Sequence, residues 1–300
     1  MKSLSIIKIK HSFQALSLSL GLVVGLISSV EAQDALVFAP LPKESDIATI
    51  TRSLPLANEM ARILDRKVTV KYYKNYNEII QAFLKGAVDL VQLGPLNFVA
   101  LNKVTVDLQP IVSIRSARNQ QSYRCVLVAP MDGLRKLDEI KQLVAPKVLL
   151  TQPLSTCGWI AADSFFADAG LTLSDYSYQY ENTHDRVALA LLRNEGTIGC
   201  MADFMAERFQ DLGLEVLKEG PLNPMLNLSA NSKNLLPAEL QKLQAELLAL
   251  PAEKLQTLRV GKFGFVAFDS QQMKQFTDRV ETVTVKNGSL HKLLLVDETP

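Results

Sequence analysis

The sequence lacks a marked excess of charge of either sign. Its 32 lysine and arginine residues are balanced by 31 aspartate and glutamate residues, so the formal net charge is +1. Such a chain has no general electrostatic attraction to nucleic acid or to an anionic membrane, and we expect no nucleic-acid partner. Hydrophobic residues make up 48% and charged residues 21% of the chain. This is the composition of a globular protein and gives no sign of disorder.

Cysteine is scarce, and the three cysteines are Cys125, Cys157 and Cys200. Their wide spacing matches no metal-binding finger, and we expect neither a metal nor a cofactor. In an oxidising compartment two of them could form a disulfide and leave the third thiol free, but the sequence does not choose the pair. Cys125 lies in an alternating, strand-like run, where we expect it simply to be buried.

Long apolar runs are absent except near the start of the chain. There three lysines precede an uncharged apolar run, and Val30 and Ala32 stand at the −3 and −1 positions of a cleavage site. This pattern predicts a secretory signal peptide over residues 1–32, cleaved after Ala32. A retained transmembrane anchor is the alternative, although the run is short for a membrane span. No cysteine directly follows the run, so we do not expect a lipoprotein anchor.

The chain contains no internal repeat, and strand-like segments alternate with helix-like segments. This alternation is typical of an α/β protein with parallel sheet. A chain of 300 residues is longer than one core usually serves. We predict two doubly wound α/β lobes joined by a hinge, the first built from 33–121 and 222–300 and the second from 122–221. The cleft between such lobes is the expected ligand site.

The sequence also predicts the local structure of two segments. Residues 46–65 should form a helix, which Pro55 should kink or delay. Its expected buried face consists of Ile47, Ile50, Leu54, Ala57 and Leu64. Residues 221–232 are rich in proline, asparagine and serine, which favours a crossing between lobes rather than a core element.

The stretch TQPLSTCGW, residues 151–159, lies between an expected strand and an expected helix. Ser155 and Thr156 fall where the helix begins, so their hydroxyls would join the free N–H groups and the positive dipole end of its first turn. Gly158 would let a ligand or another backbone come close. Together these features suit a phosphate-like anion. The alternative is that Ser155 or Thr156 only caps the helix.

A nucleophilic Cys157 is a second alternative for this stretch. Its general base would be His184, oriented by Asp203. The local signatures of cysteine proteases are absent, however. A metal site formed by Cys157, His184 and Cys200 is less favoured still.

The chain resembles the substrate-binding proteins of phosphonate, phosphite and phosphate ABC importers, the PhnD-like family of periplasmic binding proteins. The resemblance covers about residues 35–270 and depends on an ordered series of segments rather than on any single one. The series consists of FAPLP, LPLANEMARIL, VKYYKNYNEIIQAFLKGAVDLVQLGPLNFV, SYRCVLVAP, GLRKLDEIK, PLSTCGW, ENTHDRVALALLRNEG and CMADF.

The resemblance implies a type 2 periplasmic-binding-protein fold that closes on an oxyanion and performs no chemistry. The protein would be a periplasmic monomer that binds a small oxyanion and docks on a membrane permease. A sensory module acting with a membrane receptor is the alternative. The residues matching the family's ligand-binding positions are Ser155, Thr156, Cys157, Gly158, His184, Tyr123, Tyr76 and Asp203.

Each of these positions also has a purely structural interpretation. Tyr76 and Tyr123 could be ordinary surface aromatics, and His184 or Asp203 could cap a helix. Two features depart from the family pattern. Cys157 replaces a hydroxyl and would be a weak donor. Asn223 stands where binders of 2-aminoethylphosphonate carry an acidic residue, which favours phosphate, phosphite or a simple alkylphosphonate.

Overall fold

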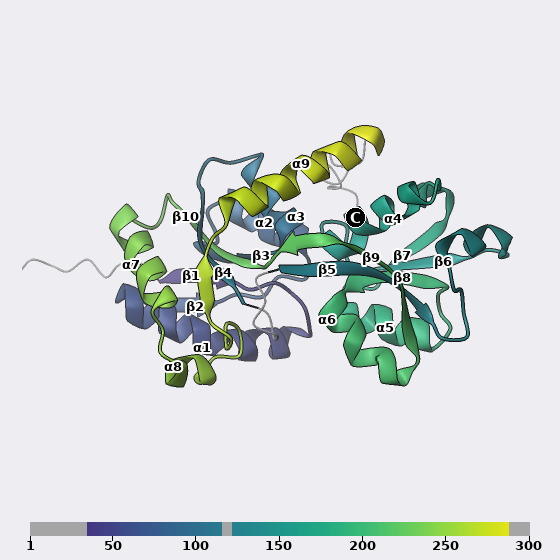
Figure 1. Ribbon diagram of the computed structural model, residues 1–300. Coiled ribbons are helices and arrows are strands. Elements are labelled where there is room, and N and C mark those ends of the chain that lie inside the picture. Colours follow the sequence, from purple (N-terminus) through teal and green to yellow (C-terminus); the bar gives the residue numbers. More distant parts are fainter. Residues whose placement is uncertain (1–34, 116–121, 288–300) are drawn as a thin grey trace, which may run out of the picture. The chain divides into compact units, whose positions relative to one another are not determined.

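The computed structural model describes residues 35–115 and 122–287, and its strands form two mixed sheets (Figure 1). The predicted signal peptide and its cleavage site lie outside the described residues. Within the part of the chain that the structure describes, no helix is both long and apolar enough to span a membrane.

The first sheet has the strand order β11-β4-β10-β3-β1-β2. Strands β2, β1 and β3 are parallel, whereas β10 runs antiparallel to β3 and β4, and β11 antiparallel to β4. The bounds of its elements are β1 Leu36–Ala39, α1 Asp46–Leu64, β2 Val68–Val70, α2 Tyr76–Leu84, β3 Leu90–Leu93, α3 Pro95–Asn102, β4 Leu108–Ile114, β10 Asn227–Asn231, α7 Pro237–Leu248, α8 Ala252–Thr257, β11 Phe265–Ala267 and α9 Ser270–Asn287.

The second sheet has the strand order β7-β6-β8-β5-β9. Here β6 is parallel to β7 and β8, and β5 is antiparallel to β8 and β9. The bounds are β5 Ser122–Pro130, η1 Leu137–Gln142, β6 Lys147–Leu150, η2 Thr156–Ile160, α4 Ala161–Asp168, η3 Leu173–Asp175, β7 Ser177–Tyr180, α5 His184–Leu192, β8 Ile198–Ala202, α6 Asp203–Ala206, η4 Glu207–Leu212 and β9 Leu214–Pro224.

Each sheet carries helices on both faces, which buries apolar side chains on each side. Helices α2, α3 and α9 pack on one face of the first sheet, and α1 and α7 pack on the other. In the second sheet α4 and α5 take opposite faces. The predicted α/β class is therefore confirmed. The sheets are mixed rather than purely parallel, because each also contains antiparallel strands.

The paired strands β5 and β9 lie beside the two passages of the chain between the sheets. Tyr123 of β5 is paired with Asn223 of β9, and β10 of the first sheet begins three residues after β9 ends. The chain from Asp34 onward clusters as one compact unit. The lobe boundaries at 121/122 and 221/222 therefore remain a prediction.

The structure corrects the local expectations for α1 and for residues 221–232. Helix α1 continues through Pro55 without a late start, and Ile47 and Leu54 are exposed. Its buried face instead consists of Thr49, Ser53, Leu56, Ala57, Glu59, Met60, Ile63 and Leu64. Residues 227–231 form β10, a fully buried strand inside the first sheet rather than a mere crossing.

Candidate functional site

A cavity lies where several strands of both sheets end. Most of its lining residues follow the carboxyl ends of β1, β2, β3, β6, β7 and β8, which is where ligands bind in open α/β sheets. The lining residues are Leu41, Lys43, Tyr76, Gly94, Asn97, Tyr123, Ser155, Thr156, Cys157, His184, Ala202, Phe204, Met205, Met225 and Leu226. All the predicted site residues except Gly158 and Asp203 are in this set.

Ser155 begins the helical turn at the cavity and acts as its cap. Its Oγ accepts a hydrogen bond from the Gly158 N–H at 3.2 Å, and its carbonyl accepts from the Trp159 N–H at 3.2 Å. The capping interpretation is therefore correct for Ser155. The same hydroxyl still has a proton to donate into the cavity, so capping does not exclude a role in ligand binding.

Gly158 lies behind the cavity rather than in its wall. A Cβ atom there would lie 2.3 Å from Thr151 Oγ1 and 2.7 Å from the Gln152 carbonyl oxygen. The turn that presents Ser155 and Thr156 therefore requires glycine for space, and no ligand contact is needed to explain it.

Thr156 connects the helical turn to the first sheet. Its Oγ1 accepts a hydrogen bond from the Leu96 N–H, in the first turn of α3, at 3.1 Å. The hydroxyl also forms a hydrogen bond with Tyr123. The next N–H groups of the turn, those of Thr156 and Cys157, are at helix positions that have no intrahelical partner.

Cys157 is bonded to Cys125 in a disulfide, and Cys200 is a buried free cysteine. The expectation that Cys125 is simply buried is thus incomplete. A disulfide sulfur is neither the nucleophile nor the thiol donor considered for Cys157, and it cannot join His184 and Cys200 as a thiolate metal ligand. What Cys157 can offer a ligand is its backbone N–H. Burial raises the pKa of the Cys200 thiol above its usual range.

His184 is the first residue of α5, after the N-cap Thr183, and it faces the cavity. Its Nδ1 accepts a hydrogen bond from the Ala202 N–H at 3.4 Å. Burial, and then the charge of Lys43, lower the pKa of His184 to about 3. The imidazole is therefore neutral near pH 7 with its proton on Nε2, so it can donate one hydrogen bond into the cavity but carries no charge.

Tyr76 and Tyr123 are both buried in the cavity wall, one from α2 and one from β5. Burial raises the pKa of the Tyr76 phenol to about 12 and raises the pKa of Tyr123 as well. Both groups therefore stay neutral and can donate hydrogen bonds. The interpretation as ordinary surface aromatics is wrong for both.

Asp203 and Asn223 lie outside the cavity lining. Asp203 begins α6, and its Oδ1 accepts a hydrogen bond from the Phe204 N–H at 2.8 Å. Asn223 lines a separate cavity with Cys125 and Arg279, and its Oδ1 accepts from Arg279 Nη2 at 2.9 Å. The argument from Asn223 about the ligand's amine is therefore not supported by its position.

Lys43 is the site residue that the sequence reasoning missed. It lies between β1, which ends at Ala39, and the N-cap of α1, which is Ser45. Desolvation, then the charge of Arg52, lower the pKa of its ammonium to about 8, and Glu44 opposes them. The residue as a whole is exposed, although it also lines the cavity. A cation in the segment that follows the first parallel strand was the signal that could have revealed it.

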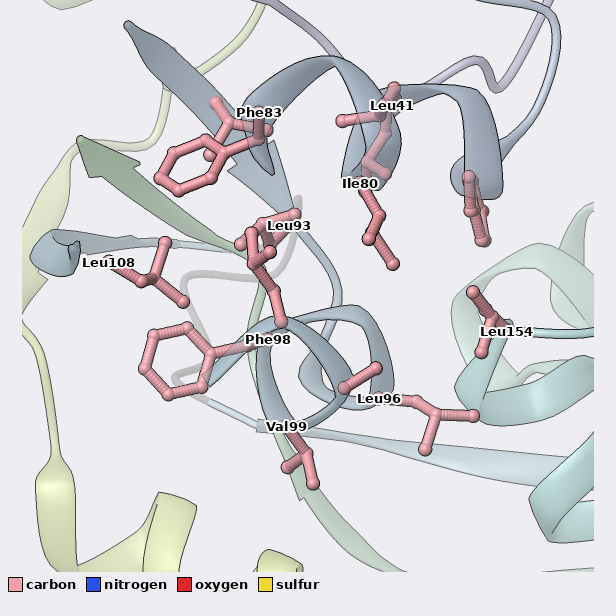
Figure 2. Close-up of a cluster of buried hydrophobic side chains, with 14 of the residues drawn as sticks. Leu41, Ile80, Phe83, Leu93, Leu96, Phe98, Val99, Leu108 and Leu154 are labelled. Carbon is pink, nitrogen blue, oxygen red and sulfur yellow. The ribbon is translucent and has the colours of Figure 1, made fainter. Parts of the chain in front are cut away.

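The loop before η2 also contacts the first sheet through Gln152 and Leu154. Gln152 Oε1 accepts a hydrogen bond from the Tyr76 N–H at 3.0 Å, and the Leu154 carbonyl accepts from Asn97 Nδ2 at 3.0 Å. The Leu154 side chain packs into the cluster formed by α2, α3 and β3 (Figure 2). Elements of both sheets therefore hold the cavity wall in place.

Solved structures of binding proteins share this fold. PhnD1 from Prochlorococcus marinus, in complex with methylphosphonate, is similar with a TM-score of 0.71 and 17% identity, covering 85% of this chain and 98% of that chain. A binding protein component of an ABC phosphonate transporter from Pseudomonas aeruginosa is similar with a TM-score of 0.69 and 19% identity, covering 87% and 96%. The periplasmic aliphatic sulphonate binding protein SsuA from Escherichia coli is similar with a TM-score of 0.55 and 14% identity, covering 85% and 93%.

A family model agrees with this fold and extends over most of the chain. Residues 38–276 match the model described as the phosphonate periplasmic substrate-binding protein of ABC transporters. The matched range includes every element that lines the cavity, from the segment after β1 to the passage between β9 and β10. The chain therefore belongs to the family of periplasmic substrate-binding proteins of phosphonate ABC transporters.

Proposed function

We propose that the protein binds a phosphorus oxyanion in the cavity and presents it to the membrane permease of an ABC importer. The ligand would be phosphate, phosphite or an alkylphosphonate. The observation that carries this proposal is the convergence of donors on one cavity. The hydroxyls of Ser155 and Thr156, the phenols of Tyr76 and Tyr123, the neutral imidazole of His184 and the ammonium of Lys43 all line it.

These donors can replace the water that an oxyanion loses on entering a closed site. Hydrogen bonds from N–H and O–H groups to a charged oxygen are stronger than those between neutral groups. The N–H groups of Thr156 and Cys157 would add the positive end of a helical turn. Closure of two lobes about β5 and β9 would then complete the site, as in other hinged binding proteins.

The proposed role involves binding without chemistry. The disulfide between Cys125 and Cys157 removes the sulfur that a nucleophilic mechanism would need. The carboxylate of Asp203 is outside the cavity lining and is bonded to the Phe204 N–H. We further propose a monomer without nucleic-acid partners, exported by a signal peptide that is cleaved after Ala32.

Titration calorimetry of the purified protein with a panel of anions tests this function. We expect heat of binding with at least one of phosphate, phosphite and methylphosphonate. Sulfate and thiosulfate test whether the cavity distinguishes phosphorus from other tetrahedral anions. Absence of binding to every phosphorus oxyanion in the panel would refute the proposed function.

A further inference from the structure

Lys43 is the one charged side chain among the described residues that line the cavity, because His184 and the two tyrosines are neutral. The described lining contains no carboxylate. An ammonium group on a ligand would be repelled by Lys43, and the nearby carboxylate of Asp203 is already bonded to the Phe204 N–H. An anionic group, by contrast, would be attracted by Lys43.

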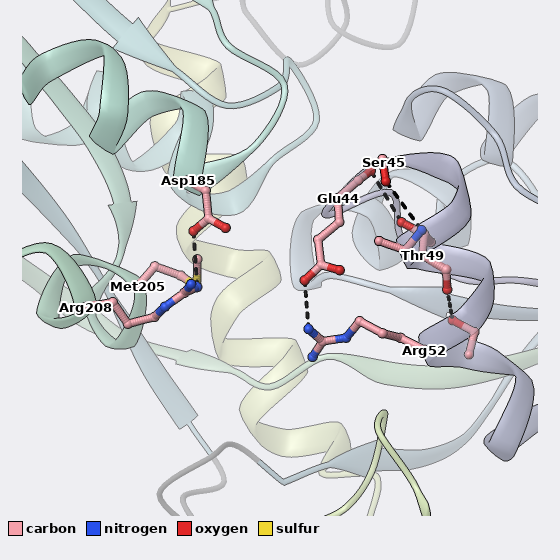
Figure 3. Close-up of polar contacts among 9 residues, drawn as sticks. Glu44, Ser45, Thr49, Arg52, Asp185, Met205 and Arg208 are labelled. Carbon is pink, nitrogen blue, oxygen red and sulfur yellow. Dashed lines mark hydrogen bonds and ion pairs between the residues drawn. The ribbon is translucent and has the colours of Figure 1, made fainter. Parts of the chain in front are cut away.

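Three carboxylates close to lining residues are held by other partners. Asp203 lies between the lining residues Ala202 and Phe204 and contributes to the raised pKa of Tyr123, and its Oδ1 accepts a hydrogen bond from the Phe204 N–H at 2.8 Å. The other two are Glu44 and Asp185 (Figure 3). Glu44, the neighbour of Lys43, pairs with Arg52 at 2.7 Å, and Asp185, the neighbour of His184, pairs with Arg208 at 3.1 Å. Neither lines the cavity. They therefore leave the charge of Lys43 as the dominant one inside it.

The rest of the wall is largely apolar, with two methionines among its side chains. Its apolar members are Leu41, Ala202, Phe204, Met205, Met225 and Leu226. Such a surface favours a hydrocarbon group and gives no gain to an ammonium group, which loses its water without finding a partner. Methionine side chains also adapt their shape readily to different apolar groups.

We propose that the cavity selects an oxyanion with an apolar substituent and without an ammonium group, and that Lys43 determines this selection. The inference rests on the proposed function and narrows its ligand to alkylphosphonates. In this proposal Lys43, in the segment after β1, excludes aminoalkylphosphonates. The lowered pKa of Lys43 agrees with a cation that has lost part of its hydration and lies near the charge of Arg52, effects that Glu44 opposes only in part.

Two pairs of nearly isosteric ligands test the selection by titration calorimetry. Propylphosphonate and 2-aminoethylphosphonate differ by a methyl group in place of an ammonium group, as do ethylphosphonate and aminomethylphosphonate. For the wild-type protein we expect the alkyl member of each pair to bind at least about tenfold more tightly, because the ammonium loses hydration without gaining a partner.

Substitution of Lys43 separates its charge from the shape of the cavity. In Lys43→Met we expect the preference to shrink to within about threefold and the alkylphosphonate itself to bind more weakly, because an attractive charge is lost. Lys43→Arg should keep the preference. Lys67→Met is the matched control, since Lys67 is exposed and directly precedes β2, at the opposite end of a parallel strand. Melting temperatures would verify that each variant is folded.

The outcomes distinguish this inference from the proposed function. If the wild-type protein binds 2-aminoethylphosphonate as tightly as propylphosphonate, the selection is refuted while the proposed function stands. An unchanged preference in Lys43→Met would refute the role of Lys43. Binding of phosphate or phosphite but of no alkylphosphonate would refute the claim that the cavity selects a ligand with an apolar substituent. If no phosphorus oxyanion binds, the proposed function itself fails and the inference falls with it.

Discussion

At the scale of single residues, His184 shows how the surroundings determine a side chain's charge. Its Nδ1 is occupied by the Ala202 N–H, and burial beside Lys43 lowers its pKa to about 3. Because the pKa of His184 is lower in the folded protein than in the unfolded chain, the unfolded chain binds more protons at pH values between the two. Stability therefore rises with pH across that range and is lost as the solution becomes acidic.

This linkage predicts an acid sensitivity that depends on His184. Between pH 7 and pH 5 the wild-type protein should lose about 1–2 kcal/mol of unfolding free energy through this residue, allowing for its partial exposure. In His184→Gln, whose side-chain oxygen can still accept from the Ala202 N–H, this loss should disappear. Urea unfolding at both pH values measures the difference, and equal losses in the two proteins would contradict the low pKa.

The sequence led to six of the residues that line the cavity but not to their chemical states. Ser155 and Thr156 could be found because they fall at the start of a helix that follows a strand, whereas Tyr76 and Tyr123 were found through the family resemblance. The neutrality of His184 could not be predicted, because it depends first on burial by the fold and then on the charge of Lys43, a residue far from it in the chain. Lys43 itself was missed because a lysine after a strand is usually solvated and carries no distinctive motif.

At the scale of elements, the turn η2 and the helix α3 are joined by a buried hydrogen bond. The Leu96 N–H of α3 has no partner within its own helix at this position, and Thr156 Oγ1 supplies one. A buried donor that loses its acceptor costs more than a hydrogen bond gains on average. The junction therefore depends on a hydroxyl at residue 156.

Thr156→Val is expected to reduce the unfolding free energy by about 1–3 kcal/mol, because it leaves the Leu96 N–H unsatisfied. Thr156→Ser retains the hydroxyl and should cost clearly less. Chemical denaturation of the two variants measures the difference. A loss of stability as large in Thr156→Ser as in Thr156→Val would show that the methyl group, rather than the hydroxyl, holds the junction.

The strand β10 shows why one element could not be predicted from composition. Its asparagine and serine residues suggested a surface crossing, yet all five residues are buried. Two of its polar side chains donate to partners in the sheet or in the helix that covers it: Ser229 Oγ donates to Asn227 Oδ1 at 2.7 Å, and Asn231 Nδ2 donates to the Phe83 carbonyl of α2 at 3.4 Å. Composition does not show such partners, whereas the alternating strands and helices around β10 followed the expected pattern.

At the scale of the whole molecule, the Cys125–Cys157 disulfide closes a loop of chain within the second sheet and its helices. The two cysteines are 32 residues apart in sequence. A cross-link of this kind stabilises a protein mainly by restricting the unfolded chain. It also joins β5, beside the passage between the sheets, to the turn that carries Ser155 and Thr156.

Removal of this cross-link in a Cys125→Ser/Cys157→Ser protein should lower the unfolding free energy by about 2–4 kcal/mol. Cys200→Ser is the matched control for loss of a sulfur from the same buried cluster without loss of the bond. Thiol titration of the denatured, unreduced wild-type protein should find one free thiol. Three free thiols would contradict the pairing.

Gly158 has a consequence for how this part of the protein can vary during evolution. A side chain at that position would collide with the backbone of Gln152 and with the side chains of Thr151 and Ser155. Relatives that keep the turn should therefore inherit the glycine even when their ligands differ. Cys157 is under a different constraint, because its sulfur serves the bond with Cys125. We expect it to be exchanged freely in lineages that have lost that partner.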